Sequence, residues 1–159
     1  MTKPQTIDDL VRRSVAARAD NPALADAPNR ADILGGEPRR LTWSEVDAEI
    51  NAMAGALAAR DVGPGTPVAI QLTNVVELPL LILACFRLGA VAVPFPVQHR
   101  NHELHHGVET AEFRLMITAD RPDRPDQIDR VRSSLADYGV DVVDVADLTT
   151  GDNPDAAPR

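Results

Sequence analysis

Apolar residues recur along this chain at two kinds of spacing, and each kind predicts a different secondary structure. Apolar residues three and four positions apart share one face of an α-helix, so they predict helices. Short apolar runs bounded by glycine, proline or asparagine predict strands. The predicted helices span residues 7–20, 43–60, 75–88, 102–111 and 126–138. The predicted strands span residues 68–72, 91–93, 115–118 and 140–145.

Residues that can cap helices stand at four of these five starts. Thr6 can accept a hydrogen bond from the backbone amide of Asp9 at the start of the first helix. Thr42 and Glu45 have the spacing of a capping box, in which each side chain bonds the backbone of the other residue. Asn101 can cap the helix over 102–111 in the same way.

The predicted helix over residues 75–88 is apolar on nearly every side. Thr73 and Asn74 precede it and can cap it. A helix that is apolar all round must be covered by other parts of a protein on most sides.

The segment between the first two helices predicts a short β-hairpin. Residues 23–25 and 32–34 have the composition of short strands, and Gly35-Gly36-Glu37-Pro38 is typical of a turn before Leu41.

Strands and helices alternate from residue 68 to residue 145, with short loops between them and no internal repeat. This order predicts the α/β class, with a mainly parallel sheet, helices on both faces and right-handed crossovers. We expect one α/β domain over residues 1–147. Residues 148–159 consist mostly of Thr, Gly, Asp, Asn, Pro and Ala, which predicts a polar linker or the truncated end of a domain.

Composition narrows the class of protein. The 159 residues are enough for about one domain, and 24 acidic against 16 basic residues give a net charge of −8. This charge argues against nucleic acid and anionic membranes as partners. The longest uncharged apolar run, residues 78–86, is too short to span a bilayer, and the first twenty residues lack the apolar core of a signal peptide. Cys85 is the only cysteine, so we expect a cytoplasmic protein without disulfides.

A histidine cluster is the strongest candidate for metal chemistry. His102 shares a helix face with His105 or His106 at three- and four-residue spacing, which can present two nitrogen ligands to zinc or nickel. Glu103 and Glu109 are the local candidates for further ligands. The alternative is a solvated helix face that is rich in histidine, since no second group of ligands stands elsewhere in the sequence. His99 completes the set of four histidines.

Other segments that can carry chemistry have simpler interpretations. Gly63 and Gly65 lead from a helix into a strand, which is the wrong order for a phosphate loop. Thr149-Thr150-Gly151 resembles part of such a loop, but acidic residues follow it and no lysine does. Cys85 lies within the apolar helix, where a thiol acts as a small hydrophobic group.

Five segments together resemble the N-terminal part of the adenylate-forming superfamily of AMP-binding enzymes, which includes acyl- and aryl-CoA synthetases, peptide-synthetase adenylation domains and luciferases. The family's order is a helix after a Leu-Thr-aromatic start, a Val-Gly-x-Gly turn, a strand, a buried helix and Gly-Ala-Val-x-Val-Pro. The resemblance covers about three quarters of the chain. The matching segments are Leu41-Thr42-Trp43-Ser44-Glu45-Val46, Val62-Gly63-Pro64-Gly65-Thr66-Pro67-Val68, Ile70-Gln71-Leu72-Thr73-Asn74, Leu88-Gly89-Ala90-Val91-Ala92-Val93-Pro94 and Leu115-Met116-Ile117-Thr118-Ala119-Asp120.

The resemblance implies a ligase that activates a carboxylic acid with ATP and magnesium and passes the acyl group to coenzyme A, for example in fatty acid metabolism. The phosphate loop and catalytic lysine of that family follow the region matched here, and the only lysine of this chain is Lys3. No catalytic or cofactor-binding residue can therefore be assigned. We expect this segment alone to have no catalytic activity and to bind no cofactor.

Two interpretations of the partners follow. As an N-terminal fragment, the chain would pack against the remaining synthetase domains or associate with itself. The alternative is a stand-alone binding or regulatory module, or the partner subunit of a split synthetase.

Overall fold

The structure, a computed structural model, describes residues 6–149 and confirms the predicted α/β class. Four parallel strands form its main sheet in the order β4-β3-β5-β6. These strands are β3 (Pro67–Gln71), β4 (Val91–Pro94), β5 (Leu115–Thr118) and β6 (Asp141–Asp144). The predicted strand positions are therefore confirmed to within about two residues at each end.

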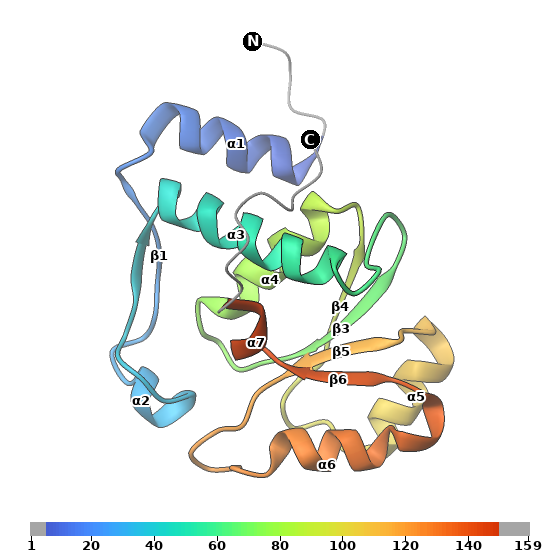
Figure 1. Ribbon diagram of the computed structural model, residues 1–159. Coiled ribbons are helices and arrows are strands. Elements are labelled where there is room, and N and C mark those ends of the chain that lie inside the picture. Colours follow the sequence, from blue (N-terminus) through green and yellow to red (C-terminus); the bar gives the residue numbers. More distant parts are fainter. Residues whose placement is uncertain (1–5, 150–159) are drawn as a thin grey trace.

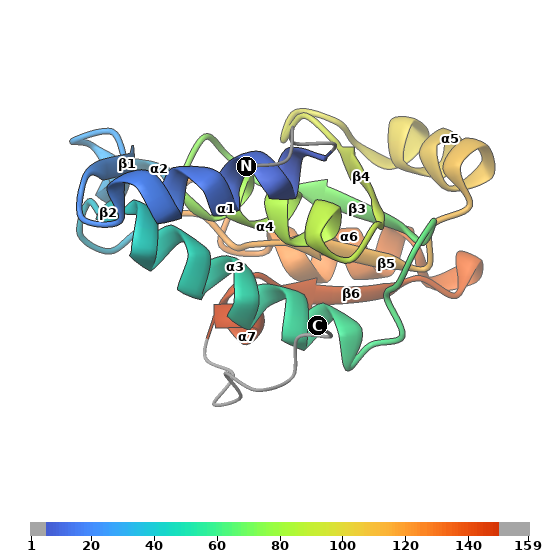
Figure 2. The ribbon, with the colours of Figure 1, turned by 90° about the horizontal axis from the view of Figure 1, so that it is seen from above.

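Helices cover both faces of this sheet, as the alternating pattern predicts (Figures 1 and 2). One face packs against α3 (Trp43–Ala58) and α4 (Glu77–Arg87), and α1 (Ile7–Arg18) packs against these two helices. The other face packs against α5 (Asn101–Ala111) and α6 (Gln127–Ser134), which a short 3-10 turn (Ala136–Tyr138) follows. The side chains of neighbouring strand residues alternate between the two hydrophobic clusters, for example Val68 and Ile70 on the α3 face and Ala69 on the α5 face.

The predicted hairpin between residues 23 and 34 is wrong in its second strand. β1 (Pro22–Ala25) pairs antiparallel with β2 (Arg40–Thr42), and the residues predicted as a strand at 32–34 belong to a short helix, α2 (Arg30–Ile33), and its end. The cause is a tertiary contact, because the Arg30 side chain is buried and bonds Glu77 of α4. Local sequence carries no signal for a partner so far along the chain.

Two of the predicted helix caps are confirmed. The Thr6 hydroxyl accepts a hydrogen bond from the Asp9 amide at 3.0 Å, and the Asp9 carboxylate accepts one from the Thr6 amide. The Thr42–Glu45 pair has the same reciprocal arrangement at the start of α3.

Two other caps differ from the prediction. Neither Thr73 nor Asn74 caps α4; instead, the amide of Val76 donates to the carboxylate of Asp26, which lies at the end of β1. Asn101 is the first residue of α5 rather than its cap. The start of α4 thus takes its cap from a distant part of the chain, whereas the start of α5 uses Glu103 of the same helix.

The boundary of the folded region also differs from the expected one. Residues 148 and 149 were predicted as the start of a linker, but they belong to α7 (Ala146–Thr149), which packs against α3. The side chain of Leu148 is fully buried in the α3 cluster. The rest of the predicted linker, residues 150–159, lies outside the described residues. Within residues 6–149 no helix combines the length and apolar character that crossing a bilayer requires.

We expect Leu148→Ala to destabilise the fold by about 2 kcal/mol, the low end for a buried leucine, because a helix of one turn can partly close the cavity. Asp147→Ala is the matched control, since Asp147 is the exposed neighbour on the same helix, and its effect should stay within about 0.5 kcal/mol. Urea unfolding followed by circular dichroism measures both. Equal midpoints for the two variants would show that α7 contributes nothing to stability.

Candidate functional site

The sheet topology singles out one edge as the place where an α/β protein binds ligands. The chain moves from β3 outward to β4, and then returns to the other side of β3 with β5 and β6. The direction of winding therefore reverses between β3 and β5. In open parallel sheets the crevice at the carboxyl ends of two such strands is the usual binding site.

In this chain the crevice between β3 and β5 is filled by a glutamine. Gln71 is the last residue of β3 and is almost fully buried. Its side-chain amide donates hydrogen bonds to the carbonyls of Pro96 and His99 at 3.1 and 3.2 Å, and its side-chain oxygen accepts one from Gln127 at 2.8 Å. The hydroxyl of Thr118, at the end of β5, donates to the backbone carbonyl of Gln71. These contacts tie the β4–α5 loop and the start of α6 to the sheet.

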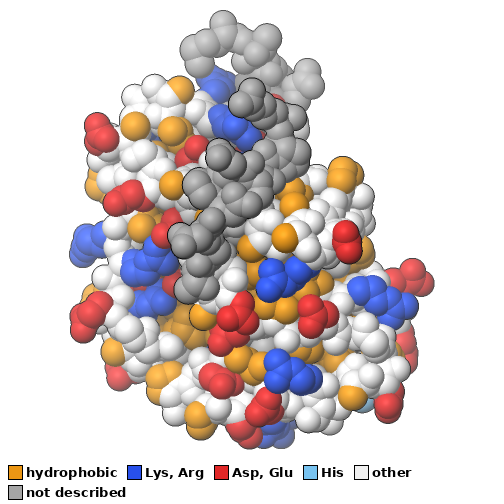
Figure 3. Space-filling view, viewed as in Figure 1, with side chains coloured by type: hydrophobic (Ala, Val, Ile, Leu, Met, Phe, Trp, Pro, Cys, Tyr) orange, Lys and Arg blue, Asp and Glu red, His pale blue; other side chains and the backbone are white. Residues whose placement is uncertain are grey.

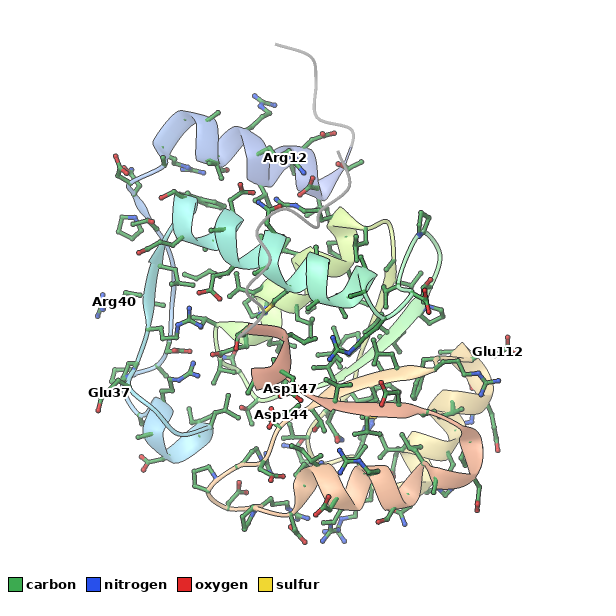
Figure 4. All side chains as sticks on the ribbon, viewed as in Figure 1. Arg12, Glu37, Arg40, Glu112, Asp144 and Asp147 are labelled. Carbon is green, nitrogen blue, oxygen red and sulfur yellow. The ribbon has the colours of Figure 1, made fainter. Side chains whose placement is uncertain are left out.

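A hollow of about 320 Å³ lies beside this filled crevice, at the carboxyl ends of β5 and β6. Arg30, Leu34 and Glu77 line one side of it, and Asp120 and Asp144 line the side formed by the strand ends. Figure 4 labels Asp144 and Asp147 at this edge, where β6 leads into α7. Figure 3 looks onto this side of the molecule and shows hydrophobic side chains among separate acidic and basic ones. The hollow lies at the edge of the sheet where this class of fold usually binds ligands.

A buried ion-pair network forms the wall opposite the strand ends. Arg30 bonds both oxygens of Glu77, at 2.7 and 2.9 Å, and one oxygen of Asp26 at 2.7 Å. The backbone amides of Arg39 and Val76 also donate hydrogen bonds to the Asp26 carboxylate. This network fixes the β1–β2 ribbon and α2 against the first turn of α4.

The network decides the charge states of its members. Burial works against the charged form of Asp26, but the amides of Arg39 and Val76 and the Arg30 guanidinium together lower the pKa of Asp26. Burial likewise opposes ionisation of Glu77, and its bonds to Arg30 outweigh that cost and lower the pKa of Glu77. The two carboxylates in turn raise the pKa of Arg30. All three groups are therefore charged at neutral pH.

These charges do not fit a nucleotide triphosphate. Among the described residues, Arg30 is the only cation that lines the hollow, and it is already paired with two carboxylates, whereas Glu77, Asp120 and Asp144 contribute three negative charges. The Asp120 carboxylate accepts a hydrogen bond from the backbone amide of Ile128, and the Asp144 carboxylate accepts one from the amide of Ala146. A polyphosphate needs cations or free amides at its oxygens. Within residues 6–149, the lining of this hollow is an acidic wall instead.

The glycine segments lie away from this edge. Gly65 has φ +79° in the turn between α3 and β3, where its amide donates to the Gly89 carbonyl at 2.8 Å. That turn lies at the amino ends of the strands, which agrees with its interpretation as a helix stop. Of the Thr149-Thr150-Gly151 segment, Thr149 lies in α7 and the other two residues fall outside the described residues.

The predicted histidine cluster is divided between two sides of α5. The His105 ring bonds the Ser134 carbonyl and hydroxyl at 2.8 and 3.1 Å and stacks at 5.0 Å on Tyr138. His102 and His106 instead line an apolar hollow of about 330 Å³ beside β4, together with His99.

The two expected carboxylate ligands are engaged elsewhere. The Glu103 carboxylate accepts a hydrogen bond from the backbone amide of Arg100 at the start of α5. The Glu109 carboxylate accepts one from the Tyr138 hydroxyl at 3.4 Å. Over the described part of the chain, no three His, Cys, Asp or Glu side chains are grouped as a metal site requires.

From this geometry we expect weak metal binding. Two imidazoles from His102 and His106 give an incomplete coordination shell, so titration with zinc or nickel should show a dissociation constant weaker than about micromolar. His102→Ala should abolish whatever heat the titration releases, and His105→Ala should leave that heat unchanged. A submicromolar constant in calorimetry would contradict the expectation.

Cys85 behaves as its position in the sequence predicts. Its side chain is fully buried on the inner face of α4, and burial raises the pKa of the thiol to about 12. A thiol protonated at neutral pH is a poor nucleophile.

Sequence reasoning missed the residues that matter most at the carboxyl edge. Arg30, Glu77, Gln71 and Gln127 are buried polar residues, and only Gln71 belongs to a segment that the family resemblance singled out, where it was given no role. The one available signal was Gln71 itself, which interrupts an apolar strand just before its end.

Comparison with known proteins places this fold in a family. The family model described as AMP-binding enzyme matches residues 11–158. Novobiocin biosynthesis protein H of Streptomyces niveus is 31% identical over 117 residues, which is 74% of this chain and 18% of that protein. A salicyl-AMP ligase / salicyl-S-ArCP synthetase of Mycobacterium tuberculosis is 28% identical over 134 residues, which is 84% of this chain and 23% of that protein.

Solved structures agree on the fold. The Klebsiella oxytoca NpsA N-terminal subdomain superposes with a TM-score of 0.74 at 20% identity, covering 97% of this chain and 34% of that one. The crystal structure of VinN gives 0.75 at 22% identity, covering 93% of this chain and 34% of that one. The chain thus spans about a fifth of the curated relatives and about a third of the solved chains.

The parallel sheet, the matched segments and the family model agree, and this chain belongs to the AMP-binding enzyme family. Its fold is like that of the NpsA N-terminal subdomain.

Proposed function

We propose that this chain is the N-terminal structural layer of an enzyme that activates a carboxylic acid. In the complete enzyme the carboxylate would attack the α-phosphorus of ATP with magnesium, giving an acyl-adenylate and pyrophosphate. A thiol would then attack the acyl carbon and release AMP. The family match over residues 11–158 carries this proposal.

Coenzyme A is our first candidate for the thiol. Acetyl-coenzyme A synthetases are among the relatives, one of them, from Rubrobacter xylanophilus, 35% identical over 85 residues. The salicyl-AMP ligase acts, by its name, toward an ArCP carrier instead. A comparison of coenzyme A with a carrier protein as acceptor would separate the two, and a preference for the carrier would overturn the choice of coenzyme A.

The contribution of this chain is architectural. Among the described residues, the acidic hollow and its fully paired Arg30 supply no group for the triphosphate, and the nucleotide-binding groups would come from the rest of the enzyme. The chain would instead hold the remaining domains in position through its surface.

Exchange of labelled pyrophosphate into ATP tests the proposal. The isolated chain should give background exchange with a panel of aliphatic and aromatic carboxylic acids. The product of the natural gene locus, whether one longer chain or this chain with a partner, should give exchange that depends on one of these acids. Carboxylate-dependent exchange by the isolated chain, or none by the natural product, would refute it.

A further inference from the structure

We draw no further inference here: the strongest candidate, the apolar hollow of about 330 Å³ between β4 and α5, carries no proposal because nothing in the described residues shows what covers it.

Discussion

Arg30→Ala should destabilise the fold by about 3 kcal/mol at pH 7, because it leaves two carboxylates buried beside an empty space. The Arg30 side chain is 10% exposed, and those of Asp26 and Glu77 are 0% and 7% exposed. We choose the low end of the range for a broken buried pair because Glu77 keeps a bond to Arg39 at 3.3 Å. Urea unfolding measures the loss.

Acidification should reduce this loss of stability. In the wild type the pKa values of Asp26 and Glu77 are lowered. Their stabilising contribution is therefore complete above the ordinary carboxylate pKa, about 4, and is lost as the pH falls through the lower folded values. In Arg30→Ala, burial without the guanidinium raises the pKa of Glu77. As the pH falls, Glu77 is therefore protonated in the variant before it is protonated in the wild type, and the variant loses its buried unpaired charge. The difference between the two proteins should shrink between pH 7 and pH 4.

Two further variants distinguish the effect of breaking the buried ion pair from the effect of removing an exposed charge. Arg12→Ala removes an exposed guanidinium that is paired with Asp8 on the same helix, and should cost less than about 1 kcal/mol. Arg30→Met combined with Glu77→Met should be less destabilising than Arg30→Ala, because no unpaired charge remains at Glu77. An Arg30→Ala loss that is below 1 kcal/mol, or equal at pH 7 and pH 4, would contradict this account.

The same ion-pair network marks the limit of what the sequence could predict. Apolar periodicity predicted every strand of the main sheet, because those strands are stabilised by burial that repeats along the local sequence. It failed at α2, where the conformation depends on a bond between Arg30 and a glutamate 47 residues away. A hydrophobic pattern holds no information about a polar partner at that separation.

In the candidate site, too, contacts between residues far apart in the chain could not be predicted from the local sequence. The sequence predicted the histidine spacing on α5 but not that His105 turns to Ser134 of α6 while His102 and His106 face β4. Resemblance to the family predicted that nucleotide-binding groups would be missing. It could not predict that the crevice of the fold is filled by this chain's own glutamines, since that requires the relative positions of β3 and α6.

Gln71→Leu should therefore destabilise the fold by about 2–4 kcal/mol, although leucine has nearly the volume of glutamine. The substitution removes three hydrogen bonds and leaves the carbonyls of Pro96 and His99 and the side-chain amide of Gln127 without this partner. Each buried polar group left unpaired costs about 1–3 kcal/mol, and water can reach the half-buried carbonyls, which limits the sum. Gln98→Leu, on the exposed part of the same loop, should stay within about 0.5 kcal/mol.

The double variant tests whether the two glutamines act as a pair. Gln71→Leu with Gln127→Leu removes both partners of the 2.8 Å bond, so its loss should be smaller than the sum of the two single losses. Denaturant unfolding of the four proteins gives this coupling. Strictly additive losses would mean that the glutamines do not stabilise each other. The filled crevice would then be held by the Gln71 bonds to Pro96 and His99 alone, and α6 would be positioned by its apolar contacts with the sheet.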